Sequence, residues 1–261
     1  MNAETPVLGL SEALNLSLYR VANEPVRTYP FPHFYATDVF HPDILRQIHT
    51  CWPRPDQFLT YKDVGNIERE RFYFRLEFAS IVKLELEKRV FWESVVEWLS
   101  SPAFVEIAFA KYADAIRDRL AQQLGIDCTD AADFAKLIRF NASLGWDISG
   151  YRLLPHADDP RVVYNLLFYV PETADRATLG TTLYVPKDHG FASSGEPRHA
   201  RDRFEAVITF PYLPNTVFSF LRTPRSFHGM EGIASANTER KLLLYSVMLT
   251  DDVARQAKIV F

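Results

Sequence analysis

From about residue 137 to residue 249 the chain is a series of short apolar runs, and this texture constrains the fold more than any other feature. The runs are rich in Val, Ile, Leu, Phe and Tyr, and Pro, Gly, Asn and Asp interrupt them. Such a pattern is typical of strands joined by turns, so it predicts about eight strands. They are expected at 137–144, 149–157, 162–170, 180–185, 205–210, 216–221, 226–230 and 240–249.

The N-terminal half has a different texture, in which helix signals alternate with extended aromatic segments. For the longest helix, Ser101 and Pro102 are a suitable N-cap and first-turn proline, and Gly125 stands where a helix often ends. Apolar residues recur every four positions from Phe104 to Leu120. The sequence predicts helices at 42–51, 90–99 and 102–124.

With 261 residues, the chain is long enough for one large domain or two small ones. No repeat, low-complexity tract or linker-like stretch divides it, so we expect a single domain, 1–261. Residues 1–135 would form a helical and extended support, and residues 137–250 the strand-rich core. Aromatic residues make up 14% of the chain, which favours wide sheets with a ring-filled interior. The predicted class is α+β, mainly β, with helices packed on a sandwich or barrel of antiparallel strands.

Charge and cysteine content narrow the class of partners. The formal net charge is −4, without the positive surplus that binding nucleic acid requires. Cys51 and Cys128 are far apart and no CxxC occurs, which predicts two reduced, buried thiols rather than a disulfide or a cysteine zinc site. Neither a signal peptide nor a long apolar segment is evident. We therefore expect a soluble, cytoplasmic protein without a membrane partner.

Two His-x-Asp triplets occur, and their contexts differ. The triplet that begins at His41 opens a predicted helix, where a first-turn proline and an acidic residue have a structural explanation. The triplet that begins at His156 ends a predicted strand, where residues i and i+2 point to the same face. His156 and Asp158 could therefore bind one metal ion. Asp159 would point away on a continuing strand, so Asp158 is the favoured carboxylate.

His228, in the segment SFHGM, and Arg240, at the start of the last long run, complete a larger pattern. This pattern resembles the metal and cosubstrate signature of the iron(II)- and 2-oxoglutarate-dependent oxygenases, in particular the prolyl-4-hydroxylase-like branch. In chain order the matching strand motifs are GYRLLPHADD, LLFYVP, LGTTLYVPKD, YLPNTVFSFLRTPRSFHGM and ERKLLLYSV. The resemblance covers residues 137–250.

The resemblance implies a double-stranded β-helix, or jelly-roll, core that carries an iron site. His156, Asp158 and His228 would bind iron(II) as a two-histidine, one-carboxylate facial triad, which leaves positions for other ligands. In the family, 2-oxoglutarate fills two of these positions and O2 the third. Arg240 would bind the distal carboxylate of 2-oxoglutarate, because a guanidinium stays charged and offers two parallel hydrogen bonds.

The same resemblance assigns further residues to the cosubstrate pocket. Tyr169 in LLFYVP and Asn165 on the same strand are candidates, and Thr182 in GTTLYV is another. An ordinary packing role remains the alternative for each. If Arg240 faces inward, Leu242, Leu244 and Ser246 share its face of the strand, although both faces could be covered.

The sequence does not decide the role of two features at the predicted mouth of the core. The polar stretch 188–203 is long for a connection within a sheet, so it is either a lid or a solvated loop. Arg152 and Arg161 flank His156, and Arg222 and Arg225 precede His228. They would make the mouth locally positive and would suit an anionic substrate.

The resemblance implies an iron(II)- and 2-oxoglutarate-dependent dioxygenase. It would hydroxylate or otherwise oxidise an unactivated C–H bond of a small-molecule or saccharide-type metabolite and release succinate and CO2. Two alternatives use the same residues. One is a zinc-dependent hydrolase or cupin-like enzyme in which the His, Asp, His set activates water. The other is a catalytically inactive jelly-roll binding module.

Overall fold

The computed structural model describes residues 9–60, 62–63, 69–195 and 198–259. Its strands are β1 (His33–Thr37), β2 (Arg71–Arg75), β3 (Ile138–Ile148), β4 (Leu153–His156), β5 (Val162–Tyr169), β6 (Thr182–Pro186), β7 (Phe204–Thr209), β8 (Thr216–Leu221), β9 (His228–Met230) and β10 (Glu239–Leu249). The eight predicted strands correspond one to one to β3 through β10. β1 and β2 lie in the N-terminal half, where the sequence indicated extended aromatic segments between helices but no defined strand.

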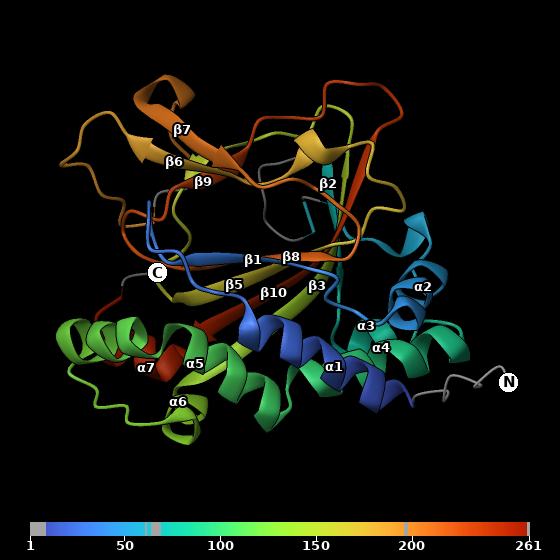
Figure 1. The fold of residues 1–261 in the computed structure, drawn as a ribbon, viewed down its shortest axis with the longest axis horizontal. Coiled ribbons are helices and arrows are strands. Elements are labelled where there is room, and N and C mark those ends of the chain that lie inside the picture. The colour runs from blue at the N-terminus through green and yellow to red at the C-terminus, as the bar shows by residue number, and fades with distance from the viewer. Residues whose placement is uncertain (1–8, 61, 64–68, 196–197, 260–261) are drawn as a thin grey trace, which may run out of the picture.

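Two antiparallel sheets are formed by the described residues. The larger sheet has the strand order β1-β8-β5-β10-β3-β2, and the smaller sheet has the order β4-β9-β6-β7. Figure 1 shows the smaller sheet on one side of the larger sheet and most of the helices on the other side. The predicted combination of antiparallel sheets with supporting helices is therefore confirmed.

The helices are α1 (Leu10–Asn23), α2 (Pro42–Thr50), α3 (Phe78–Ile81), α4 (Leu86–Leu99), α5 (Pro102–Arg119), α6 (Ala131–Leu137) and α7 (Asp251–Gln256). The predicted 102–124 helix is confirmed as α5 followed by a π-helical turn, Leu120–Leu124. Ser101 caps it through a hydrogen bond from the Phe104 backbone N–H, and Gly125 ends it with a φ of 63°. α4 begins four residues before the predicted start.

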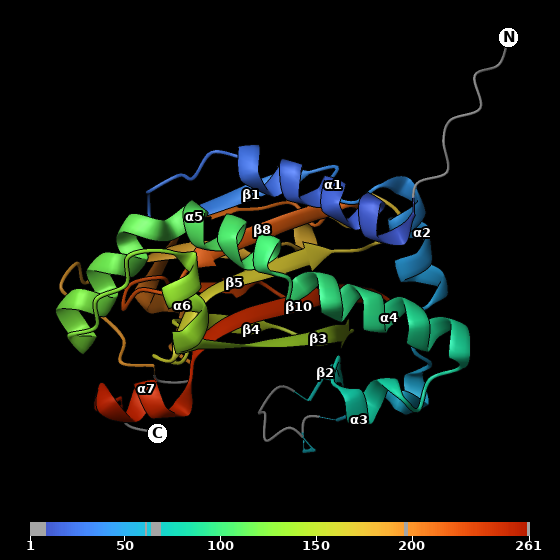
Figure 2. The same cartoon turned by 90° about the horizontal axis from the view of Figure 1, so that it is seen from below.

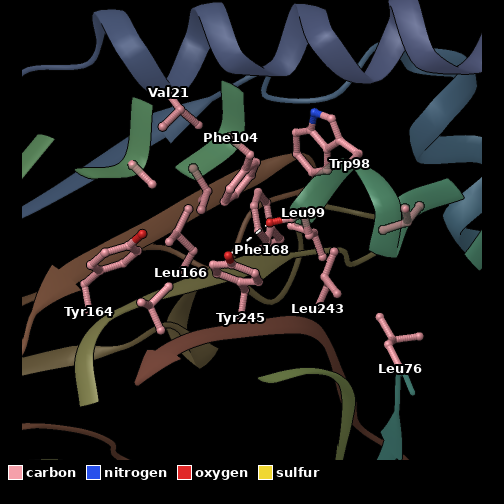
Figure 3. Packing of buried hydrophobic residues seen from close by; sticks show 14 of the residues in the cluster. Val21, Leu76, Trp98, Leu99, Phe104, Tyr164, Leu166, Phe168, Leu243 and Tyr245 are labelled. Atoms are coloured by element: carbon pink, nitrogen blue, oxygen red, sulfur yellow. Dashed lines mark hydrogen bonds between the residues drawn. The ribbon is translucent and has the colours of Figure 1, made fainter. Parts of the chain in front are cut away.

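The main hydrophobic core lies between the helices and the larger sheet. Figure 2 shows α1, α4 and α5 lying across this sheet, and Figure 3 shows their side chains meeting those of the strands. The ring of Phe104 packs edge-on against Tyr245 at 5.1 Å, and Trp98 lies near Phe168. The Tyr245 hydroxyl donates to the Leu99 carbonyl at 3.0 Å, so the buried phenol is satisfied. Each fully buried side chain of this kind contributes about 1.5–3 kcal/mol of apolar burial.

Successive side chains of β10 point alternately into this core and into a second apolar cluster on the other face of the sheet. Leu243 and Tyr245 belong to the core beneath the helices. Leu242 belongs to the cluster between the sheets, and Leu244 packs against it. Because alternate strand residues share a face, Arg240 is on the side of Leu242 and Leu244, which is the inward orientation that the sequence left open.

Cys51 and Cys128 are both buried, and no disulfide joins them in the described part of the chain. This agrees with the predicted pair of buried thiols. Within the ranges that the structure describes, no helix combines the length and apolar character needed to span a bilayer.

Candidate metal centre

Two histidines meet where β4 pairs with β9. His156 ends β4, His228 begins β9, and the antiparallel register places them opposite each other. Side chains at directly opposed positions point to the same face. Their ring centroids are 4.3 Å apart, and the planes are tilted by 46°. Strand pairing therefore brings together the imidazoles of two residues that are 72 positions apart in the chain.

Asp158 completes the group from a position just beyond the end of β4. Its Oδ1 atom lies 3.5 Å from Nε2 of His156 and 3.7 Å from Nε2 of His228. Among the described residues, these three offer ligand atoms that all lie within 4.8 Å of one another. The His41 triplet has a different place, because His41 is the N-cap of α2 and its ring accepts from the Asp43 backbone N–H.

Each histidine presents its Nε2 atom to the centre in the same way. Nδ1 of His156 lies 3.0 Å from the Leu154 carbonyl oxygen, and Nδ1 of His228 lies 3.0 Å from that of Ser226. A proton on Nδ1 would be donated to the carbonyl and would leave the Nε2 lone pair directed to the centre. This is the arrangement that orients metal-bound histidines.

The protonation states also suit a metal. Burial alone would raise the pKa of the Asp158 carboxyl, but His228, His156 and Arg222 more than offset it and hold that pKa below its usual range. Burial lowers the pKa of His228 to about 4. At neutral pH the centre therefore holds a carboxylate and a neutral His228, and both are forms that bind a metal.

Several contacts hold Asp158 in place although it is not on a strand. The Asn165 side-chain amide donates to its Oδ2 at 2.6 Å, and Arg222 Nε donates to its backbone carbonyl at 3.1 Å. Arg119 donates to the carbonyls of Val162, at 2.7 Å, and Pro160, which follow in the chain. Side chains from three other parts of the chain thus hold the segment from Asp158 to Val162.

The arginines expected at the mouth have different roles. Arg222 is only 3% exposed and contacts the Asp158 segment, and Arg161 forms hydrogen bonds with Asp159 at 2.9 and 2.6 Å. Arg152 and Arg225 are exposed. Asp159 is engaged with Arg161, and its carboxylate is not part of the group of ligand atoms formed by His156, Asp158 and His228.

A cavity of about 410 Å³ adjoins the centre. Its volume is in the range of small-molecule sites. The residues that line it include the three candidate ligands, Thr181 just before β6, and polar or charged residues of the larger sheet, among them Arg71, Tyr73, Asn141, Ser143, Asn165, Arg240 and Ser246.

Arg240 is buried in the wall of this cavity, with 2% of its surface exposed. Its guanidinium carbon lies 5.4 Å from the ring centroid of Tyr169 and 5.5 Å from that of Tyr212. Arg240 Nη1 donates to Oδ2 of Asp147 at 2.9 Å. Its Nε is buried and has no hydrogen-bond partner among the described residues. A buried donor of this kind is a place where a ligand acceptor would fit.

The other predicted cosubstrate residues are distributed around Arg240 and Asp158. The Tyr169 hydroxyl donates to Thr181 Oγ1 at 2.6 Å and accepts from the Thr181 backbone N–H at 3.1 Å. Thr181 lines the cavity, whereas the Thr182 hydroxyl lies 2.8 Å from that of Thr209. Asn165 lines the cavity but contacts Asp158 rather than Arg240.

Sequence reasoning missed Arg71, which also lines the cavity. Arg71 and Asp147 form a two-bond ion pair, and Asp147 is the residue that Arg240 contacts. Burial works against the charge, but Asp147 raises the pKa of Arg71 well above its usual value. The two residues are 76 positions apart, so only the pairing of β2 with β3 reveals the contact.

The 188–203 stretch is packed against the site where the structure describes it; residues 196–197 are outside the described residues. The Ser193 backbone N–H donates to the Pro224 carbonyl at 2.8 Å, and that of His199 donates to the Pro155 carbonyl at 2.9 Å. Phe191 stacks on Phe227, beside His228, with a centroid distance of 5.5 Å. Closure as a lid stays a prediction.

No family model matches this sequence, and no curated protein matches it. Solved structures with a similar fold include a prolyl-4-hydroxylase of Pseudomonas putida, with 14% identity, coverage of 93% of this chain and 100% of that chain, and a TM-score of 0.45. A 2OG-Fe(II) oxygenase family oxidoreductase of Burkholderia pseudomallei has 11% identity, coverage of 94% and 93%, and a TM-score of 0.46.

A third neighbour is the epimerase SnoN in complex with Fe3+, alpha-ketoglutarate and nogalamycin RO. Its identity is 11%, the match covers 90% of this chain and 83% of that chain, and the TM-score is 0.45. The structural neighbours are thus iron- and 2-oxoglutarate-dependent oxygenases, prolyl-4-hydroxylases included, at low sequence identity.

Proposed function

We propose that this protein is an iron(II)- and 2-oxoglutarate-dependent dioxygenase that oxidises an unactivated C–H bond of a small molecule. One observation carries the proposal. His156, Asp158 and His228 converge in the wall of a cavity that also contains a buried arginine, Arg240, with an unused donor. A metal site and an anion site in one cavity are the two parts that this chemistry needs.

The order of the strands supports a double-stranded β-helix core. Along the chain β3, β5, β8 and β10 belong to the larger sheet, and β4, β6, β7 and β9 belong to the smaller sheet. The chain therefore passes repeatedly from one antiparallel sheet to the other, as in a jelly roll. On this proposal β1 and β2 extend the larger sheet at its two edges, and residues 1–261 act as one domain.

The donor set of the metal centre fits iron(II). Two imidazole nitrogens and one carboxylate oxygen on one side of an ion form a facial triad, and the remaining positions stay open to other ligands. Bound iron(II) would supply, with 2-oxoglutarate and O2, the oxidation of the substrate, with succinate and CO2 as coproducts. His156, Asp158 and His228 would hold the ion, and Asn165 would keep the Asp158 carboxylate turned toward it.

Arg240 is the residue proposed to bind the distal carboxylate of 2-oxoglutarate. Its guanidinium lies against Tyr169 and Tyr212, and its Nε is available. Thr181, whose hydroxyl accepts from Tyr169, offers a further polar group in the same cavity. We assign Thr182 to the support of β6, because its hydroxyl contacts Thr209.

The rest of the cavity would receive the substrate. Leu153, Leu167 and Met230 supply apolar wall, which helps to keep water from the reacting groups. Asn141 and Ser246 supply neutral hydrogen-bonding groups, which suit a polar small molecule such as a saccharide-type metabolite. The reaction is proposed to take place in the cytoplasm without a membrane partner, and the net charge of −4 disfavours binding to nucleic acid.

An anaerobic titration tests the proposal. Metal-free protein is titrated with iron(II) and 2-oxoglutarate, and the visible charge-transfer band of the chelated keto acid is followed. The wild-type protein should form the band. Asp158→Ala should lose it, with a fall in iron affinity of about 100-fold or more, because one of the three ligands is gone. Asp159→Ala is the matched control and should keep the band, because Asp159 contacts Arg161 instead.

The outcomes separate the alternatives. Tightly bound zinc without the band would favour a hydrolase that uses the same three residues. Failure to bind any metal would favour an inactive binding module. A full band in Asp158→Ala would contradict the ligand assignment.

A further inference from the structure

Arg71, Asp147 and Arg240 form one row across three neighbouring strands. The register pairs Arg71 with Asp147 between β2 and β3, and Asp147 with Arg240 between β3 and β10. Figure 2 shows these three strands side by side. Directly paired residues project from the same face of a sheet. Arg71 and Arg240 both line the cavity, and the Asp147 side chain between them is fully buried.

The hydrogen bonds in this row fix the orientation of Arg240. Asp147 Oδ1 accepts from Arg71 Nε, and Asp147 Oδ2 accepts from Arg71 Nη2 at 2.7 Å and from Arg240 Nη1 at 2.9 Å. Asp147 therefore holds one terminal nitrogen of the Arg240 guanidinium, and the rings of Tyr169 and Tyr212 lie beside the guanidinium. The guanidinium is held in place by the protein before a ligand arrives, which lowers the cost of binding.

The charges in the row explain the presence of a second arginine. A carboxylate that paired with Arg240 alone would cancel its charge, and a ligand carboxylate would then meet a neutral pair. Two guanidinium groups and one carboxylate leave a net charge of +1. In a buried site this charge has a large effect, since the effective dielectric constant is far below that of water.

We propose that Arg71 and Asp147 are positioning residues of the cosubstrate site. Asp147 orients Arg240, and Arg71 restores the positive charge that Asp147 removes. The site thereby selects 2-oxo acids that carry a second carboxylate. This inference rests on the proposed function and adds to it two residues outside the metal centre, one of them from an edge strand.

The test compares two ligands that differ at the distal end. 2-Oxoglutarate and 2-oxobutyrate are titrated anaerobically against the iron(II)-loaded protein, and dissociation constants are read from the charge-transfer band. Arg71→Met should raise the dissociation constant of 2-oxoglutarate about tenfold or more, because it removes a buried positive charge. The constant for 2-oxobutyrate should stay unchanged, because that acid has no distal carboxylate.

Three further variants separate charge from structure. Arg71→Met combined with Asp147→Asn has Arg240 as the one charge of the row, so it should recover much of the affinity for 2-oxoglutarate. Arg71→Lys keeps the charge and should keep the preference between the two acids, and this variant decides the matter if Arg71→Met does not fold. Arg75→Met changes an exposed arginine of the same strand and should match the wild type.

Two results would overturn the inference while leaving the proposed function intact. One is an unchanged preference for 2-oxoglutarate in Arg71→Met or a lost preference in Arg71→Lys. The other is an equal loss of affinity for both acids, which would show a general effect on the fold. Absence of the band in the wild-type protein would instead contradict the proposed function itself.

Discussion

His33 is a buried histidine that the proposed chemistry does not use. It lies in β1, is 1% exposed, and packs against the rings of Phe31 and Phe210. Its Nδ1 lies 2.7 Å from the Phe31 carbonyl oxygen. Burial lowers the pKa of His33 below its usual value. The folded protein therefore keeps this ring neutral at a pH where the unfolded chain protonates it.

This difference predicts how stability depends on pH. Below about pH 6.5 the unfolded state binds more protons at this site than the folded state, so the free energy of unfolding falls as the pH falls. We expect His33→Gln to reduce the loss of stability between pH 8 and pH 5, as measured by urea unfolding. His189→Gln, in an exposed loop, is the control and should show the wild-type dependence. An unchanged pH dependence in His33→Gln would contradict the prediction.

At the scale of single residues, the sequence predicted which side chains could bind a metal better than it predicted how those side chains are held in place. It favoured Asp158 over Asp159 on the assumption that the strand continues, yet β4 ends at His156. Asp158 reaches the centre because Asn165 and Arg222 hold it there. Asn165 is 7 positions and Arg222 is 64 positions from Asp158, and no local sequence pattern predicts either contact.

β9 is a three-residue strand, and its middle residue is a glycine for a steric reason. Gly229 follows His228 directly and lies against β4. A Cβ atom on Gly229 would be 2.4 Å from the Leu153 carbonyl oxygen, which is a backbone atom and cannot move aside freely. The close approach of β9 to β4 is what brings His228 beside His156.

Gly229→Ala should therefore separate the two strands at the metal centre. We expect a lower melting temperature and a fall in iron(II) affinity of about tenfold or more, since small shifts of the groups that orient ligands have effects of this size. Competition with a metal-binding dye measures the affinity. Gly190→Ala, in an exposed loop where a Cβ meets no atom closer than 3.4 Å, should leave both quantities unchanged. Wild-type iron affinity in Gly229→Ala would contradict this role of the glycine.

Among the elements, those with strong local signals were predicted, and those defined by distant partners were not. Alternation and turn residues located β3 through β10, and a cap, a proline and a terminal glycine located α5. β2 is a strand because it pairs with β3. More than sixty residues separate the end of β2 at residue 75 from the start of β3 at residue 138, so no local pattern predicts this pairing. α1 was not predicted. Its N-cap residue, Gly9, offers no side-chain cap, and its apolar residues are buried only because the helix packs against the rest of the protein.

The described residues form three layers, and the two faces of the larger sheet have different roles. One face is covered by α1, α4 and α5 and holds the main core (Figures 1 and 2). The other face looks toward the smaller sheet and contributes Arg240, Asn165 and Ser246 to the cavity. The residues that form the main core and the residues that line the cavity are therefore on opposite faces of the same strands. Along β5 and β10 the two kinds of residue alternate, because successive side chains of a strand point to opposite faces.

Neighbouring leucines of β10 test this division. Leu243 is fully buried in the helix-covered core (Figure 3), and Leu244 is half-buried and lines the cavity. Leu243→Ala should lower the free energy of unfolding by about 2–5 kcal/mol, because a large buried side chain leaves a cavity behind. Below its melting temperature it should bind 2-oxoglutarate as the wild type does.

Leu244→Ala should cost less stability, because less of its side chain is buried, and it should enlarge the cavity beside the metal centre. Urea unfolding gives the two stabilities, and the anaerobic charge-transfer titration gives the two affinities. A loss of 2-oxoglutarate affinity in folded Leu243→Ala would mean that the helix-covered core and the site are coupled through β10. A larger loss of stability in Leu244→Ala than in Leu243→Ala would mean that the cavity side, rather than the helix side, stabilises the sheet.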